Sequence, residues 1–181
     1  MTRDEDLTAT LDELERVRRH TRAAVHPAWF PLVVFGLIGL ASIPFSRIGD
    51  GVGSGLFWLV AGPAGGIATS RYYTKRAVTL GAGVRGRAYC GLGVALFIAA
   101  WVAGSVTESA AAPMLAVAIG YLGFAWLERS WPTGVVAALL GVAAVVVAVT
   151  DPENGDMILT LAFGLAFTAT GLVLRRRDPV A

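Results

Sequence analysis

Hydrophobic and polar positions follow one another in long blocks along this chain. Each of six apolar blocks has about the 17 to 25 residues that a helix needs to cross a hydrocarbon core of about 30 Å. None of the blocks has an ionised side chain near its centre. The pattern therefore predicts six transmembrane helices, at residues 28–46, 52–71, 88–104, 111–127, 132–150 and 157–174.

Backbone polar groups in lipid must be satisfied within the spanning element, and a helix does this by itself. The expected fold class is therefore all-α, an integral membrane protein whose transmembrane helices form a compact bundle. Residues 28–174 make up this transmembrane domain. Residues 1–27 are expected to form a short cytoplasmic amphipathic helix, and residues 175–181 a basic cytoplasmic tail.

Small residues recur at helical spacing in the later spans, where they allow helix backbones to approach closely. The fifth and sixth spans are expected to pack as a tight antiparallel hairpin around residues 151–156, and the fourth span has a comparable stripe. These positions are Gly134, Ala137, Gly141, Ala144 and Ala148; Thr160, Gly164, Thr168 and Gly171; and Ala112, Ala116, Gly120 and Gly123.

The N-terminal segment has an apolar face at steps of three and four residues, which predicts an amphipathic helix. Leu7, Leu11 and Leu14 lie on that face, and Arg18, Arg19 and Arg22 follow in the second half of the segment. Anionic lipid headgroups, a second copy in a homodimer, or a cytoplasmic protein would each cover such a face. A passive helix beside the membrane is the remaining interpretation.

Composition supports a membrane location, because 55% of the 181 residues are hydrophobic and the mean hydropathy is +0.64. Both values are high for a soluble protein. The single cysteine, Cys90, excludes an internal disulfide. Lys75 is the only lysine beside numerous arginines, and Ala and Gly are abundant, which is typical of a GC-rich bacterial genome.

Charge placement predicts the orientation, since basic loops resist translocation. The N-terminal segment, the loop after the second span, the loop after the fourth and the C-terminal tail hold every Lys and Arg except Arg47. These segments alternate with loops that carry mainly acids. We therefore expect a bacterial cytoplasmic (inner) membrane protein with both termini in the cytoplasm.

The loop after the second span contains Gly81, Gly83 and Gly86 in the GxGxxG spacing. A dinucleotide site with this spacing also needs a preceding strand and an acid about 20 residues further on. A membrane helix precedes this loop, so the interpretation fails. A turn rich in positive charge, facing anionic headgroups, is expected instead, with Arg71, Lys75, Arg76, Arg85 and Arg87.

The second span contains the irregular stretch "AGPAGG" near its centre. Pro63 removes a backbone donor and would kink or open the helix. Gly62 and Gly66 are consistent with a packed GxxxG contact, or with a cavity that Tyr121 also lines. Both interpretations stay open, although the fifth span lacks the matching break that an inverted repeat would give.

Catalytic and metal-binding chemistry is not indicated. The spans lack a central Asp, Glu, Lys, Arg or His, and no base lies beside a buried serine. The acidic loop at 151–156 is read as a solvated turn, with Asp156 as a cap of the helix that follows. No catalytic residue, cofactor or metal ligand is therefore expected.

The sequence thus favours a non-enzymatic membrane scaffold or sensor that engages a partner through its N-terminal helix. A small transporter or exporter of an apolar solute is the alternative, and a membrane-embedded enzyme comes third. Nucleic acid is not an expected partner, because acids precede the arginines within residues 1–27.

Overall fold

The chain is helical throughout the residues that the computed structural model describes, which are 28–48, 52–80, 86–107 and 109–178. No strand occurs among them, which confirms the all-α fold class for this part of the chain. In chain order the elements are α2 (Trp29–Ser42), the 3-10 helix η1 (Ile43–Arg47), α3 (Val52–Thr79), α4 (Gly86–Val106), α5 (Ala111–Glu128), α6 (Trp131–Thr150) and α7 (Gly155–Arg176).

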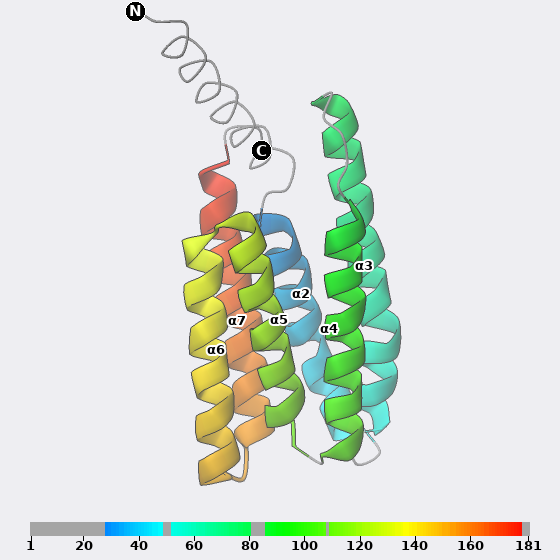
Figure 1. Ribbon diagram of the computed structural model, residues 1–181. Coiled ribbons are helices and arrows are strands. Elements are labelled where there is room, and N and C mark those ends of the chain that lie inside the picture. Colours follow the sequence, from blue (N-terminus) through cyan, green and yellow to red (C-terminus); the bar gives the residue numbers. More distant parts are fainter. Residues whose placement is uncertain (1–27, 49–51, 81–85, 108, 179–181) are drawn as a thin grey trace, which may run out of the picture.

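The long helices run alternately up and down beside one another (Figure 1). α2 starts at the end of the bundle where α3, α5 and α7 finish. We call this the basic end, because it holds Arg71, Lys75, Arg76, Arg129 and residues 175–177. We call the opposite end, with Asp151, Glu153 and Asp156 in and beside the α6–α7 connection, the acidic end.

Two residues in the left-handed backbone region end helices at these turns. Arg129 ends α5 with φ 53°, and Asp151 ends α6 with φ 42°. The Asp151 N–H donates to the carbonyl of Val147 at 2.9 Å, which satisfies a group in the last turn of α6. Pro132 lies in the first turn of α6, where its missing N–H costs no hydrogen bond.

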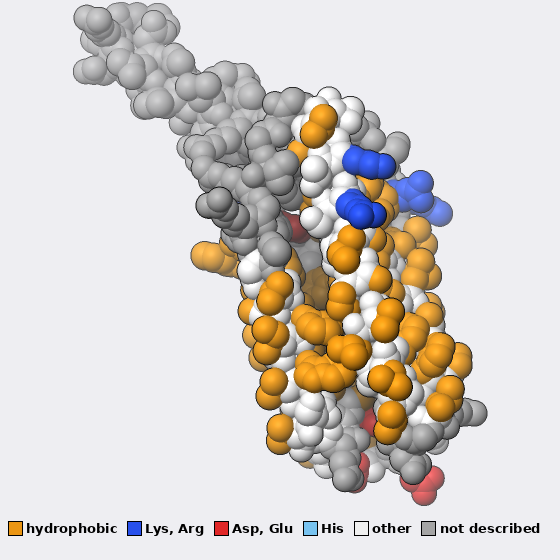
Figure 2. All heavy atoms as spheres, turned by 90° about the vertical axis from the view of Figure 1, so that its right-hand side faces the viewer, with side chains coloured by type: hydrophobic (Ala, Val, Ile, Leu, Met, Phe, Trp, Pro, Cys, Tyr) orange, Lys and Arg blue, Asp and Glu red, His pale blue; other side chains and the backbone are white. Residues whose placement is uncertain are grey.

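Among the described residues, five helices are long and apolar enough to cross a membrane, and a shorter apolar helix, Gly91–Val106, lies within α4. In the apolar windows of these five helices only 11% to 28% of the residues are buried. Most of their hydrophobic side chains therefore face outward, and Figure 2 shows them as a broad band over the face formed by α3 and α4. Such a surface suits lipid and not water.

α2 and α7 make the closest helix contact in the described bundle. A Cβ added at Gly36 of α2 would lie 2.7 Å from the backbone nitrogen of Thr168, and one added at Gly171 of α7 would lie 2.9 Å from the carbonyl oxygen of Trp29. One added at Gly164 would lie 3.1 Å from the carbonyl oxygen of Gly36. The two backbones approach closely because glycines occupy these positions on both helices.

The predicted tight pairing of α6 with α7 through their small residues is therefore wrong. Gly164, Thr168 and Gly171 of α7 face α2, whereas Gly134 and Gly141 of α6 face α5. Added Cβ atoms at Gly134 and Gly141 of α6 would each lie 3.5 Å from an alanine Cβ of α5, at Ala125 and Ala118. α6 and α7 remain neighbours, but side chains fill the space between them.

The stripe of small residues predicted for the fourth span lies on α5, and two of its glycines pack on α4. Gly120 lies against the side chain of Leu96 in α4, and an added Cβ at Gly123 would lie 3.5 Å from Leu92. α5 therefore packs α6 on one side and α4 on another.

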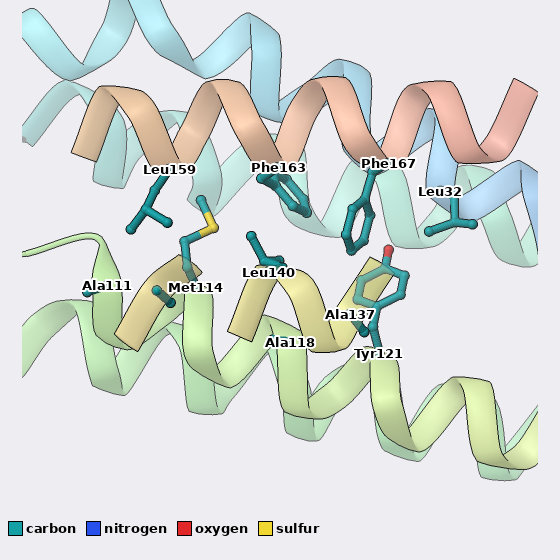
Figure 3. Packing of buried hydrophobic residues seen from close by; sticks show 11 residues of the cluster. Leu32, Ala111, Met114, Ala118, Tyr121, Ala137, Leu140, Leu159, Phe163 and Phe167 are labelled. Atoms are coloured by element: carbon teal, nitrogen blue, oxygen red, sulfur yellow. The ribbon is translucent and has the colours of Figure 1, made fainter. Parts of the chain in front are cut away.

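The core lies between α5, α6 and α7, and Figure 3 shows its side chains. Phe167 of α7 faces Tyr121 of α5, with ring centroids 4.7 Å apart at 81°, and Phe163 contacts Phe167 with ring centroids 4.5 Å apart. Edge-to-face contacts of this kind stabilise aromatic pairs beyond the area that they bury. The cluster also contains Leu32, Ala111, Met114, Ala118, Ala137, Leu140, Ala144 and Leu159.

α3 is one continuous helix with Pro63 inside it. It also continues beyond the expected end at residue 71, to Thr79. Gly62 is buried against Phe97 of α4, and Gly65 is buried against Phe35 and Ile38 of α2. The two glycines three residues apart therefore pack, whereas Gly66 has no neighbouring atom within 4 Å of an added Cβ.

Candidate functional site

A carboxylate at the basic end binds side chains from two distant helices. Asp178 follows the last turn of α7, and its Oδ1 accepts a hydrogen bond from Nη2 of Arg76 at 2.7 Å. Its Oδ2 accepts one from Nε1 of Trp29 at 2.9 Å. Because Arg76 is in the last turn of α3 and Trp29 starts α2, this carboxylate joins the ends of three helices.

Tyr72 completes this arrangement on α3. It lies one helical turn before Arg76, and its Oη accepts a hydrogen bond from Arg76 Nη1 at 2.8 Å. The planar guanidinium thus donates to a phenol and a carboxylate with different nitrogens, which a lysine could not do. We call Trp29, Tyr72, Arg76 and Asp178 the polar clamp.

Aromatic rings surround the polar clamp. The rings of Phe30 and Tyr72 stack with centroids 4.0 Å apart and 5° between their planes. Trp29 meets Tyr72 edge-on at 5.6 Å. The guanidinium carbon of Arg175 lies 5.3 Å from the centroid of the Trp29 ring, within the range of a cation–π contact. α2, α3 and α7 therefore meet through rings as well as through charge.

The ion pair is largely removed from solvent, since the side chains of Arg76 and Asp178 are each 7% exposed. Removing two charges from water costs free energy that their attraction offsets only when the geometry is good. Removing one partner of such a pair leaves a buried charge uncompensated, which is strongly destabilising. The pair therefore ties the last turn of α3 to the residue that follows α7.

Other cations at this end are exposed. They are Arg71, Lys75, Arg129, Arg175, Arg176 and Arg177. Figure 2 shows Lys and Arg side chains in the upper part of the face over α3, directly above the hydrophobic band, and acids at the opposite end. The described part of the molecule is therefore electrically asymmetric along its long axis.

Asp156 makes a second link, at the acidic end. Its Oδ1 accepts a hydrogen bond from the backbone N–H of Ala110 at 2.8 Å and lies 3.5 Å from Oγ of Ser109. It lies in the first turn of α7, yet it contacts the residues that precede α5. A negative charge there is favourable because the N-terminus of α5 carries partial positive charge. The expected cap of the following helix is thus a tie to a neighbouring helix.

The residues predicted to line a kink or cavity lie apart in the structure. Pro63 and Gly66 are exposed on the outside of α3, whereas Gly62 packs on α4. Tyr121 is buried, 5% exposed, against Phe167, and its hydroxyl points toward the side of Phe167 and Leu32 (Figure 3).

Within the described residues, no group of three or more His, Cys, Asp and Glu side chains is placed to hold a metal ion. A surface depression among the described residues is an open apolar strip along α4. It is lined by Ala95, Ile98, Ala99, Val102, Ala103, Val106 and Thr107. Its atoms are almost all carbon, so it offers contact but little directional bonding.

Several predicted residues lie outside the described part of the chain. They include the proposed contact residues of the N-terminal helix, namely Leu7, Leu11, Leu14, Arg18, Arg19 and Arg22, and the glycines Gly81 and Gly83.

Sequence reasoning missed the polar clamp. The sequence pattern places Arg76 in a basic loop, because it predicts that the span ends at residue 71, whereas α3 continues to Thr79. A signal was present, since Asp178 is the only acid that follows the three arginines after the sixth span. A single acid in a basic tail is a candidate partner for a specific cation.

No protein-family model, curated protein or solved structure matches this chain.

Proposed function

We propose that this protein is a six-span protein of a bacterial cytoplasmic membrane, with both termini in the cytoplasm. Five long apolar helices and the shorter apolar helix in α4 support six spans. Trp126 and Trp131, at the basic end, are 80% and 81% exposed. Large amphipathic rings suit the headgroup level of a membrane, and basic residues favour the inside.

Within that membrane, the protein acts as a non-enzymatic scaffold or sensor that engages a partner through its N-terminal helix. The polar clamp carries this proposal. Trp29 comes directly after the N-terminal segment and bonds to Asp178, which holds Arg76 of α3. A partner that pulls on residues 1–27 would therefore act on three spans at once.

The interior supports a structural role and not a chemical one. The described buried polar residues are Ser42, Arg76 and Thr133. Ser42 Oγ donates to the carbonyl of Gly39 at 2.7 Å, and Thr133 shares a hydrogen bond with Ser130 at 2.8 Å. These bonds satisfy the hydroxyls of Ser42 and Thr133 locally, while Oγ1 of Thr168, at the α2–α7 contact, is buried without a hydrogen-bond partner among the described residues.

Transport of an apolar solute remains the alternative. Open space beside Gly66 on α3 favours it, since a solute or a second helix would fit there. Tyr121 and Gly66 do not line a common cavity, which argues against transport. Uptake into liposomes that is unchanged by Gly66→Leu and Pro63→Ala would count against transport.

Photo-crosslinking in cells tests the scaffold role. A photoreactive amino acid is placed at position 11 or 14 of the full chain, and at position 139 as a control. Leu139 is 64% exposed on α6 and should meet only lipid. We expect defined protein adducts from positions 11 and 14 and none from 139. Adducts of twice the chain mass would identify a homodimer, and the absence of any protein adduct would refute the proposed role.

A further inference from the structure

Glycines without a packing partner lie at one level of the α3–α4 pair. The two helices are antiparallel neighbours (Figure 1), and Gly62 of α3 packs on Phe97 of α4. Gly66 and Gly93 each lie four residues from this contact toward the basic end, so they are at the same level, about 6 Å beyond it. At Gly66, Gly91 and Gly93 an added Cβ would have no neighbouring atom within 4 Å among the described residues. Alanine would fit at all three positions, so close packing does not explain these glycines.

Both helices are easiest to bend at this level. Glycine favours the helix less than every residue except proline, and kinks in helices concentrate at these two residue types. Pro63 lies three residues before Gly66 and lacks the N–H that would bond to the carbonyl of Leu59. α3 nevertheless runs unbroken from Val52 to Thr79. Contacts elsewhere along α3 therefore hold it in this shape.

Different contacts hold the two parts of α3. Toward the acidic end, Phe57 stacks on Phe45 of η1 with ring centroids 4.7 Å apart, and Gly65 packs on α2. Toward the basic end, the polar clamp joins Arg76 to Asp178, beyond α7, at 2.7 Å. α4 touches α3 only sparsely. Opening of the polar clamp would therefore release the basic-end part of α3 while the rest of the helix stays packed.

We propose that residues 67–79 of α3 are a hinged arm, which the polar clamp holds against α2 and α7 and which swings away from them when the clamp opens. Gly66 is the pivot in α3, and Gly91 and Gly93 let the start of α4 follow. A kink of about 20° at Gly66 moves residue 74, about 12 Å further along the helix, by about 4 Å. The hinge does not depend on the partner-binding role of residues 1–27, because the polar clamp and the glycines are other residues.

Distances between spin labels in the full chain test the hinged arm. Cys90 is replaced by serine, and one label is placed at Val142, which is 62% exposed on α6. The second label is placed at Thr74 on the hinged arm, or at Leu56, which is 60% exposed on the other side of the hinge. Electron–electron double resonance then gives the 74–142 and 56–142 distances in lipid nanodiscs.

Release of the polar clamp should move the two labelled positions differently. Arg76→Gln should lengthen the 74–142 distance by about 4 Å, the displacement that a kink at Gly66 produces, and leave the 56–142 distance unchanged. An unchanged 74–142 distance would overturn the proposal. Equal changes in both distances would also overturn it, because α3 would then move as one rigid helix.

Alanine substitutions locate the hinge. Gly66→Ala, Gly91→Ala and Gly93→Ala together, in the Arg76→Gln chain, should restore the original 74–142 distance, because alanine fits the open space and stiffens both helices. Gly55→Ala is the matched control, since Gly55 is equally open but lies near the start of α3. Failure of the triple substitution to restore the distance, or restoration by Gly55→Ala alone, would contradict a hinge at this level.

A second variant keeps the test valid if Arg76→Gln does not fold. Asp178→Asn removes the charge that holds Arg76 but keeps an acceptor for the Trp29 indole, and the same changes in distance are expected from it. A contact between two copies would also explain open glycines. In that case Gly66→Leu would lower the mass of the protein in detergent, measured by light scattering, whereas the hinge predicts an unchanged mass.

Discussion

Arg76 and Asp178 form an ion pair across 102 positions of sequence, with 2.7 Å between Nη2 and Oδ1. The pair fixes the end of α3 to the residue that follows α7, and Trp29 adds the start of α2. α3 otherwise packs on α2 and touches α4 only sparsely. The polar clamp therefore supplies much of the specificity with which α3 joins the bundle.

Removal of one member of the pair should destabilise the protein. Arg76→Gln leaves the Asp178 carboxylate buried without its guanidinium, which typically costs about 3 kcal/mol. Thermal unfolding in detergent micelles should show a clear fall in Tm. Lys75→Gln is the matched control, since it removes an exposed cation from the neighbouring position and should change stability by less than about 0.5 kcal/mol.

A double-mutant cycle separates the pair from its surroundings. Asp178→Asn keeps an acceptor for the Trp29 indole but removes the negative charge. Residues in direct contact should be coupled, so the double variant should lose less stability than the sum of the single variants. Strict additivity would mean that Arg76 and Asp178 do not act as a pair.

The contact between α2 and α7 gives a second prediction. Gly36→Leu places a side chain where the backbone of Thr168 lies, so the helices must separate. Overpacking of this kind costs about 1 to 3 kcal/mol. Gly66→Leu, on the open face of α3, should be close to neutral in the same unfolding assay. Equal effects of the two substitutions would argue against the close α2–α7 approach.

This contact also shows how far the sequence could predict the fold. Apolar length predicts where the helices lie along the chain, because each span must satisfy its own backbone in lipid. A stripe of small residues, however, predicts that another helix packs closely against it, and does not predict which helix. Gly164 and Gly171 pack on α2. The sequence alone favours α6 as their neighbour, because α6 directly precedes α7 in the chain.

The candidate site was harder to predict than the helices. Arg76 joins the polar clamp because α3 remains helical to Thr79 and places it one turn after Tyr72. Polar residues near the end of a span are compatible with a loop or with further helix, and composition does not decide between them. The partner of Arg76 lies 102 positions further along the chain, so the sequence around Arg76 itself does not identify it.

The acidic end gives a third prediction. Asp156→Ala removes the carboxylate that accepts the hydrogen bond from the Ala110 N–H. It also removes the negative charge from beside the N-terminus of α5. Loss of a cap of this kind costs about 1 kcal/mol. Glu153→Ala is the control, since Glu153 is exposed in the same turn. Unfolding in micelles should detect a lower Tm for Asp156→Ala alone, and equal Tm values for the two variants would show that the link contributes nothing.

The two ends of the bundle should face opposite sides of the membrane, and cysteine labelling in intact cells can test this. The natural Cys90 is replaced by serine, and a single cysteine is introduced by Leu80→Cys at the basic end or by Asn154→Cys at the acidic end. Basic segments resist translocation, so position 80 should be cytoplasmic and position 154 external. A maleimide that cannot cross the membrane should therefore label position 154 in intact cells, and position 80 only after permeabilisation. Labelling of position 80 from outside would reverse the orientation and would remove the N-terminal helix from any cytoplasmic partner.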